Sequence, residues 1–469
     1  MAAEESSLQP RPLSDFWSMD AEQRQRILLE AIAATHAWHY GRNLAYRQAV
    51  TARGVGAHLE LDGDAAGGQR EMLPRLLRPT AQTFKSYIDI LGTPFPQDQP
   101  RPFLDWLGDQ LSVDLPPAAT ARLRRRYPSL ETLLREVESS FDGLDLEILT
   151  SSGTSGRSTI MVRDGEATRS TVQSFYLAFQ RYLGMDGVQR AIFIMPRQTR
   201  IAMARMASFS VQRLGLDDDR IHFTIPFPAQ PDQVRIRAGR TFRPGFAGTV
   251  ERRLWHPFMN WMQEHYVNSR AVGGALDLLV QAEAAREKVL LFGGWVHLHA
   301  LALSLQERGR VLHLAPGSLL GTGGGLKERY PFAPSRIRED LGQVIKLADG
   351  QPAGVRDVYG MAEANWAAMQ CRAGSYHIPP WIYARALDED GRFQETPDAA
   401  GLLAFFDPYG GGQLFPAFFR TADQVRLVRP GAQPGDGLAC PCGEPGDYIR
   451  QDSIQRVDLF DEAGCAAQV

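Results

Sequence analysis

The stretch that decides the fold is Leu149-Thr150-Ser151-Ser152-Gly153-Thr154-Ser155-Gly156-Arg157-Ser158-Thr159. It follows an alternating apolar run that begins at Leu144, and its hydroxyls and glycines are typical of a tight turn that points backbone N–H groups at an anion. We therefore expect a phosphate-binding loop. Turns rich in serine and glycine that bind no phosphate are also common, so the loop alone does not establish this chemistry.

Two further motifs follow the loop along the chain. One is Tyr359-Gly360-Met361-Ala362-Glu363, and the other is Phe419-Arg420-Thr421-Ala422-Asp423-Gln424-Val425. In this order the three segments resemble the phosphate loop, the Tyr-Gly-x-Thr-Glu motif and the Thr-Gly-Asp motif of the adenylate-forming superfamily of acyl-CoA synthetases and their relatives. The resemblance implies ATP-dependent activation of a carboxylic acid to acyl-AMP, release of pyrophosphate, and transfer of the acyl group to a thiol.

The same resemblance implies a role for each matching residue. Glu363 corresponds to the carboxylate that holds Mg²⁺, and Asp423 to the carboxylate that accepts both ribose hydroxyls. These residue types suit their tasks, because a hard cation prefers carboxylate oxygen and a diol needs a two-oxygen acceptor. The adenine would lie beside Tyr359, Gly360 and Met361, and the β- and γ-phosphates would be bound by Ser151, Ser152, Gly153, Thr154, Ser155 and Gly156.

The chain departs from the superfamily pattern at two positions. Relatives often end the phosphate loop with Pro-Lys, whereas this chain has Ser158-Thr159, so a cation for the phosphates must come from another residue such as Arg157. Ala362 stands where relatives have threonine, so the hydroxyl that contacts the α-phosphate is missing. These departures keep open the alternative of an inactive homologue that only binds nucleotide.

One branch of the superfamily matches best. The segment Leu320-Gly321-Thr322-Gly323-Gly324-Gly325-Leu326-Lys327-Glu328 resembles the Thr-Gly-Gly-x-Lys motif of the bacterial bioluminescence acyl-protein synthetases. This resemblance implies nucleotide binding by Gly323, Gly324 and Gly325 and a catalytic role for Lys327, for which an ordinary surface lysine is the alternative. Further matching segments are Leu73-Pro74, Thr83-Phe84-Lys85, Pro379-Pro380-Trp381 and Gly401-Leu402-Leu403-Ala404-Phe405-Phe406-Asp407.

Four cysteines give a separate set of expectations. The pairs Cys371-x5-His377 and Cys440-x-Cys442 supply three thiolates and one imidazole, a ligand set that suits tetrahedral zinc. Similar pairs occur in members that resemble phenylacetate-CoA ligases. Buried thiols also occur without a metal, so both interpretations stay open. The remaining Cys465 lies near the end of the chain, where the resemblance to acyl-protein synthetases implies an acyl-accepting thiol and an incidental exposed cysteine is the alternative.

The composition limits the class of protein. The chain has 469 residues, of which 44% are hydrophobic, and a formal net charge of −3 at pH 7. This charge argues against a nucleic-acid partner. No window is apolar over the roughly 18 residues that a membrane span needs, and residues 1–7 are acidic and polar, unlike a secretory signal. We therefore expect a cytoplasmic enzyme that contacts no membrane.

The expected fold is α/β, an adenylate-forming core of sheets flanked by helices. Apolar runs predict strands at 191–195, 221–225, 288–292 and 311–314, and helical periodicity predicts helices at 20–52, 103–111, 130–139, 199–214, 250–266 and 296–308. Antiparallel strands are expected at 402–406 and 425–428, with a turn at Gly410-Gly411-Gly412. We predict a helical region at 1–110, the core at 111–400 and a small β-rich subdomain with its tail at 401–469. The resemblance implies little or no mobile C-terminal lid, and no lysine follows Asp423.

The predicted protein is thus an acid–thiol ligase that uses ATP and Mg²⁺, with a structural Zn²⁺ site. Its acceptor thiol is either Cys465, acting with a partner such as a reductase or a carrier protein, or coenzyme A, as in phenylacetate-CoA ligases. The sequence leaves open whether the acid is fatty or aryl.

Overall fold

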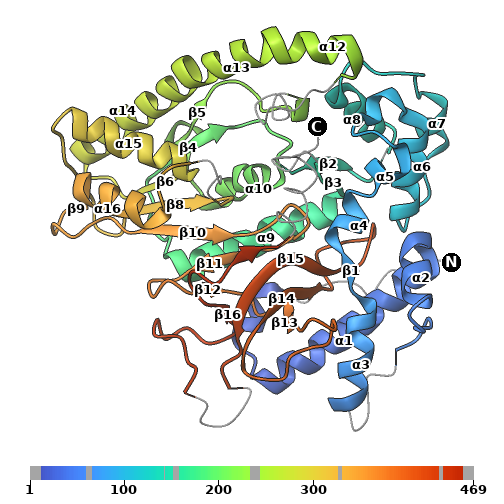
Figure 1. Ribbon diagram of the computed structural model, residues 1–469. Coiled ribbons are helices and arrows are strands. Elements are labelled where there is room, and N and C mark those ends of the chain that lie inside the picture. The colour runs from blue at the N-terminus through green and yellow to red at the C-terminus, as the bar shows by residue number, and fades with distance from the viewer. Residues whose placement is uncertain are drawn as a thin grey trace. The chain divides into compact units, whose positions relative to one another are not determined.

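The computed structural model describes residues 12–59, 66–141, 143–151, 158–232, 243–325, 330–431 and 437–457 (Figure 1). The chain divides into two units, each assembled from separate segments. Unit 1 contains Met1–Ser174, Ala362–Trp366 and His377–Val469, and unit 2 contains Phe175–Met361 and Ala367–Tyr376. The three-part division with boundaries near residues 110 and 400 stays a prediction.

Unit 2 is built on a mostly parallel sheet with the strand order β11-β10-β8-β6-β4-β5. All neighbouring strands in it run parallel except β11, which is antiparallel to β10. The strands are β4 (Arg190–Pro196), β5 (Ile221–Ile225), β6 (Val289–Gly293), β8 (Leu319–Gly323), β10 (Val355–Tyr359) and β11 (Ala368–Gln370). The predicted α/β class is therefore confirmed. The strand predicted at 311–314 is β7 (Leu312–Leu314), which pairs instead with β9 (Ile345–Leu347) in a separate sheet.

Three helices of unit 2 bury apolar side chains in the core beside this sheet: α14 (Ser269–Ala285), α15 (Trp295–Glu307) and α16 (Pro334–Val344). Unit 2 also contains α10 (Ala202–Ser210), α12 (Gly245–Val250) and α13 (His256–Met262). Leu279 of α14, Leu298 of α15 and Leu291 of β6 belong to one buried core. Burial of such side chains stabilises the layers by about 1.5–3 kcal/mol each.

The helix predicted at 250–266 is part of a longer helical run. π-helical turns at Glu251–Trp255 and Gln263–Asn268 join α12, α13 and α14. Pro257 explains the first of these turns, because a proline has no N–H to continue the α-helical ladder of the preceding turn. The helical run extends beyond the predicted boundaries at both ends, from Gly245 to Ala285.

Unit 1 begins with helices: α1 (Ala21–Arg42), α2 (Leu44–Thr51), α3 (Ala66–Leu76), α4 (Thr80–Phe84), α5 (Tyr87–Leu91), α6 (Pro100–Gln110), α7 (Pro117–Ala121) and α8 (Leu130–Glu138). The helix predicted at 20–52 is two helices. Asn43 ends the first and caps the second, since its side chain accepts a hydrogen bond from the Tyr46 N–H at 2.8 Å. Its amide also donates to the Gln110 carbonyl at 2.7 Å, which fixes the break against α6.

The β-rich part of unit 1 is an antiparallel sheet of β13 (Tyr383–Leu387), β14 (Asp398–Asp407) and β15 (Ala417–Val428), extended by the short strands β1 (Arg78–Pro79), β16 (Tyr448–Ile449) and β17 (Gln455–Arg456). The pairing Leu402↔Gln424 confirms that the predicted strands are antiparallel, and both are longer than predicted. A separate hairpin joins β2 (Glu147–Thr150) to β3 (Ile160–Arg163). Two elements cross the division between units: α9 (Gly165–Leu183) and β12 (Tyr376–His377).

Close approaches explain the predicted turn between β14 and β15. A Cβ on Gly410 would lie 2.0 Å from the Asp407 Oδ2, and one on Gly411 would lie 1.8 Å from the Phe415 carbonyl oxygen. Only glycine fits at these two positions, so Gly410 and Gly411 are a packing requirement of this turn.

Candidate functional site

The predicted phosphate loop is the connection of the β2–β3 hairpin. Thr150 pairs with Ile160, and beyond this pair the Ser151 N–H donates to the Thr159 carbonyl at 3.1 Å. The Thr159 N–H returns a hydrogen bond to the Ser151 Oγ at 2.9 Å. The base of the loop is therefore fixed by its own residues. Other predicted phosphate-binding residues lie outside the described part of the chain: Ser152, Gly153, Thr154, Ser155, Gly156 and the alternative cation Arg157.

Glu363 lies directly at the base of this loop. Its side chain is buried, and its Oε1 accepts a hydrogen bond from the Thr159 hydroxyl at 2.6 Å. Thr159 occupies one of the positions where the chain departs from the superfamily pattern. No sequence pattern connects Thr159 with Glu363, because the two residues are far apart along the chain and meet only in the folded unit.

A buried arginine holds the Glu363 segment in place. The Arg163 Nε donates to the Asn365 Oδ1 at 2.5 Å, and its Nη2 donates to the Ala364 carbonyl at 3.2 Å. The Asn365 amide in turn donates to the Gly410 carbonyl at 2.5 Å. The segment that carries Glu363 is thus attached to β3 on one side and to the β14–β15 turn on the other.

Burial shifts the pKa values of two charged groups near this network. Burial lowers the pKa of the Arg163 guanidinium to about 10, opposed by the nearby carboxylates of Glu147 and Asp407. Burial also raises the pKa of the Asp407 carboxyl to about 7, although the Tyr409 and Gly410 N–H groups favour its charged form. The Asp407 carboxyl therefore titrates close to neutral pH.

A second group near the loop comes from the helical part of unit 1. The Tyr87 hydroxyl donates to the Ser158 carbonyl at 3.0 Å. Two residues earlier, Lys85 is 7% exposed, and no ion pair of its amino group is found within the described ranges. A buried lysine without an acidic partner is unusual and marks a candidate for binding an anion. The motif Thr-Phe-Lys was visible in the sequence, but the burial of Lys85 was not.

The remaining nucleotide-binding candidates are divided between the two units. Asp423 lies on β15 in unit 1, where its N–H donates to the Thr421 hydroxyl oxygen at 3.1 Å. Tyr359 ends β10 in unit 2, and its ring meets that of Tyr376 edge-on at a centroid distance of 6.5 Å. Gly360 and Met361 follow Tyr359 in unit 2, before the chain enters unit 1 at Ala362.

The glycine-rich segment of unit 2 follows the carboxyl end of β8. Gly323 is the last residue of that strand, and Gly324 and Gly325 have φ values of +82° and +68°, which favour glycine. The hydroxyl of Thr322 on β8 is buried and makes no hydrogen bond with any residue that the structure describes. Ligands commonly bind at the carboxyl ends of parallel strands. The predicted catalytic residue Lys327 lies outside the described residues.

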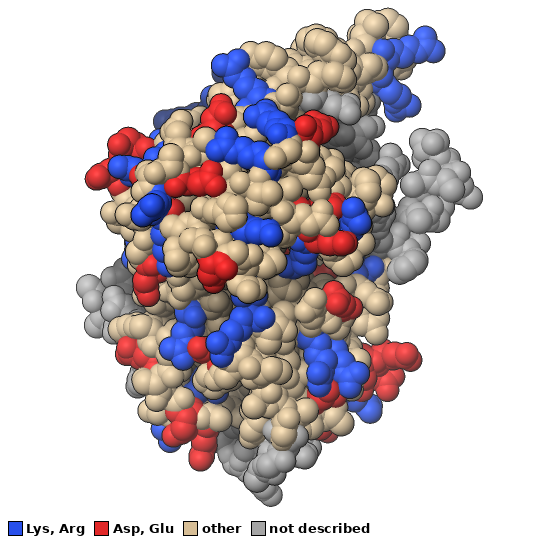
Figure 2. Space-filling model, turned by 90° about the vertical axis from the view of Figure 1, so that its left-hand side faces the viewer, with Lys and Arg blue, Asp and Glu red and all other residues tan. Residues whose placement is uncertain are grey.

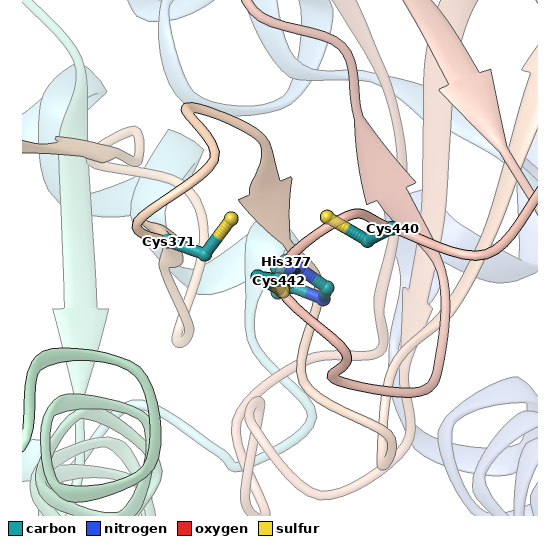
Figure 3. A group of neighbouring side chains, drawn as sticks. All are labelled: Cys371, His377, Cys440 and Cys442. Atoms are coloured by element: carbon teal, nitrogen blue, oxygen red, sulfur yellow. Dashed lines mark hydrogen bonds between the residues drawn. The ribbon is translucent and has the colours of Figure 1, made fainter.

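The structure brings the four predicted metal ligands together. The ligand atoms of Cys371, His377, Cys440 and Cys442 all lie within 4.8 Å of one another (Figure 3). All four residues are buried, and the Cys442 Sγ lies 3.3 Å from the His377 Nε2. Burial lowers the pKa of the His377 imidazole to about 4. The predicted acyl acceptor Cys465 lies outside the described residues.

A cavity of about 710 Å³ lies elsewhere in unit 1, and its lining includes α1, Tyr383, Arg385 and Arg429. None of the predicted site residues lines this cavity. On the face shown in Figure 2, basic and acidic side chains are interspersed, in keeping with the small net charge. Among the described helices, none combines the length and apolar character that crossing a membrane requires.

Comparison with known proteins identifies what the chain is similar to. Residues 272–469 match the family model described as "Acyl-protein synthetase, LuxE". Two curated relatives are named long-chain-fatty-acid–luciferin-component ligase. The Aliivibrio fischeri protein is 27% identical over 150 residues, which is 31% of this chain and 35% of the relative. The Vibrio harveyi protein is 25% identical over 180 residues, which is 38% of this chain and 43% of the relative.

The matched regions thus span less than half of each curated relative. Among solved structures, an open conformation of 2-hydroxyisobutyryl-CoA ligase in complex with 2-HIB-AMP and CoA aligns with a TM-score of 0.49 and 14% identity, over 95% of this chain and 77% of that chain. The predicted resemblance to acyl-protein synthetases is confirmed for the part of the chain that the family model matches.

Proposed function

We propose that the protein is an AMP-forming acid–thiol ligase that activates a long-chain fatty acid and transfers the acyl group to a thiol. The observation that carries this proposal is the 2.6 Å contact between the Thr159 hydroxyl and the Glu363 carboxylate at the base of the phosphate loop. The matched family model supports the class of reaction, and the names of the two bacterial relatives support a long-chain fatty acid as substrate.

The residues present fit a magnesium ion. Mg²⁺ prefers oxygen ligands and is commonly bound by one or two carboxylates together with substrate phosphates. Glu363 supplies such a carboxylate, and Thr159 holds one of its oxygens in place beside the loop. A bound Mg²⁺ would neutralise charge on the phosphates of ATP.

In the first half-reaction an oxygen of the fatty acid carboxylate bonds to the α-phosphorus of ATP, and the bond to pyrophosphate breaks. The chain contributes binding and orientation. Ser151 and the rest of the loop hold the β- and γ-phosphates, and the Lys85 ammonium adds a positive charge there. Asp423 accepts the ribose hydroxyls, and Tyr359 lies beside the adenine. The backbone turn at Gly323, Gly324 and Gly325 contacts the nucleotide, and Lys327 contacts the developing acyl phosphate.

In the second half-reaction a thiol loses its proton to solvent, its sulfur bonds to the acyl carbon, and the bond from that carbon to the phosphate oxygen breaks, which releases AMP. We assign this sulfur to Cys465, which would pass the acyl group on to a partner protein. The motifs of the acyl-protein synthetase branch and the match that includes residue 465 support this assignment. Rapid formation of acyl-CoA by the protein would instead support coenzyme A as the acceptor.

ATP–pyrophosphate exchange tests the proposal directly. With a long-chain fatty acid and Mg²⁺ we expect exchange, and Glu363→Gln should lower its rate by about 10²–10³-fold, as expected for a lost transition-state contact. Glu131→Gln is the matched control, because Glu131 lies on α8 and pairs with Arg135 of the same helix. No exchange with any fatty or aryl acid would instead favour a nucleotide-binding protein without activity.

A further inference from the structure

The cluster of three cysteines and one histidine contains no group that the proposed reaction needs. Cys371 follows β11, His377 ends β12, and Cys440 and Cys442 lie in the loop before β16 (Figure 3). Their exposed fractions are 2%, 0%, 3% and 7%. Three thiols and an imidazole gathered in a buried place form a poor hydrogen-bonding set, since thiols are weak donors and acceptors. The arrangement is better explained by a shared ligand.

The spacing of the four side chains fits one tetrahedral ion. All of the ligand atoms lie within 4.8 Å of one another. With zinc–sulfur bonds of about 2.3 Å, neighbouring sulfurs of a tetrahedral site are about 3.8 Å apart. Side-chain rotations that move these atoms by about 1 Å or less would therefore complete the site. In Figure 3 the Cys371 and Cys440 sulfurs point toward each other, with His377 and Cys442 beside them.

Backbone turns present the thiols. The Glu444 N–H donates to the Cys442 Sγ at 3.4 Å, and the Gly443 N–H donates to the Cys440 carbonyl at 2.9 Å. Gly443 has a φ of +84°, which an L-residue rarely adopts. A comparable turn holds Cys371, whose carbonyl accepts the Gly374 N–H at 3.0 Å. The hydrogen bond to the Cys442 Sγ favours the thiolate form of that cysteine, and thiolate is the form that binds metals. The other two hydrogen bonds shape the turns that carry Cys440 and Cys371.

A positive charge lies close to the cluster. The Arg356 guanidinium donates to the Cys371 carbonyl at 3.0 Å. Zn²⁺ bound by three thiolates and a neutral imidazole carries a net charge of −1, so a nearby guanidinium offsets it. Groups that surround the ligands in this way orient them and tune the metal site.

We propose that Cys371, His377, Cys440 and Cys442 bind one Zn²⁺ ion in a structural site. Four protein ligands fill a tetrahedral shell and leave no open position for a substrate, so the ion takes no part in acyl activation. Binding removes the three thiol protons, which pass to solvent. The ion fixes the loop before β16 to β12, and the proposal stands independently of the ligase activity.

Metal content tests the proposal. The full chain, purified without chelator, should contain one zinc per chain by elemental analysis, and Co²⁺ substituted for it should give the visible absorption of a tetrahedral thiolate site. Cys440→Ser should lose the zinc. Cys465→Ser is the matched control, since it removes the one cysteine outside the cluster and should leave the zinc content unchanged.

Two further measurements guard against a Cys440→Ser variant that simply misfolds. His377→Cys keeps four tetrahedral ligands and should retain zinc. In the native wild type only Cys465 should react with a thiol reagent, and all four cysteines should react after unfolding in chelator. Native protein that contains no zinc and exposes all four thiols to the reagent would overturn the proposal, as would zinc that is lost equally in Cys465→Ser.

Discussion

Removing the Thr159 hydroxyl tests whether the position of Glu363 matters for the reaction. Thr159→Val keeps the shape of the side chain and removes its hydrogen bond to the Glu363 Oε1. Thr159 is fully buried and Glu363 is 8% exposed, so water cannot easily replace the lost donor. A hydrogen bond to a charged group contributes about 1.5–3 kcal/mol. If this contribution acts in the transition state, the exchange rate falls about 10- to 150-fold.

The assay is ATP–pyrophosphate exchange measured over a range of Mg²⁺ concentrations. We expect Thr159→Val to need more Mg²⁺ as well as to react more slowly, because the carboxylate is no longer held in one orientation. Thr159→Ser restores the donor and should recover most of the rate.

Thr171→Val is the matched control, since the buried Thr171 hydroxyl donates only to the Ala167 carbonyl of its own helix, at 2.6 Å. Its exchange rate should stay within about twofold of wild type. Wild-type exchange by Thr159→Val at every Mg²⁺ concentration, or an equal loss in Thr171→Val, would refute the assigned role of the hydroxyl.

Three other changes give separate predictions. Lys85→Met should raise the KM for ATP and slow pyrophosphate exchange about 10²-fold or more, whereas wild-type kinetics would remove Lys85 from the phosphate site. Burial raises the Asp407 pKa from 3.8 to about 7, so the folded chain holds this proton more tightly than the unfolded chain. The free energy of unfolding therefore falls as the pH rises from 3.8 to about 7. Asp407→Asn should remove up to about 4 kcal/mol of this fall, as measured by urea unfolding at a series of pH values. Identical pH profiles for the variant and the wild type would contradict the raised pKa of Asp407. Incubation with labelled fatty acid and ATP should leave a hydroxylamine-sensitive label that Cys465→Ser abolishes while exchange continues, and a label that persists in Cys465→Ser excludes this thiol as the acceptor.

Local sequence patterns predicted the strands and helices whose formation depends on residues that are close together in the sequence. The apolar runs at 191–195 and 288–292 became β4 and β6 because central parallel strands are buried on both faces. Asn43 was visible in the sequence, but helical periodicity on both sides concealed its capping role. Pro257 similarly lies inside a helix that continues through a π-helical turn instead of ending.

The site was predicted less completely than the fold, for a physical reason. Motifs identified Glu363, and cysteine spacing identified a ligand set that the structure then brought together. Hydrogen bonds between distant segments have no local pattern, so the contacts of Thr159 with Glu363 and of Arg163 with Asn365 required coordinates. Burial of a single polar residue is equally invisible in sequence, which is why Lys85 was quoted only as part of a motif.

The pairing of β1 with β15 has a consequence for how the chain folds during synthesis. Arg78 pairs with Phe419, so unit 1 joins strands that are far apart in the sequence. Unit 2 is almost continuous in sequence, whereas unit 1 needs residues on both sides of it. Closing so long a loop is slow and entropically costly. We therefore expect unit 2 to fold first as the chain leaves the ribosome, and the helices of residues 12–141 to pack against their partner strands only after β15 has been made.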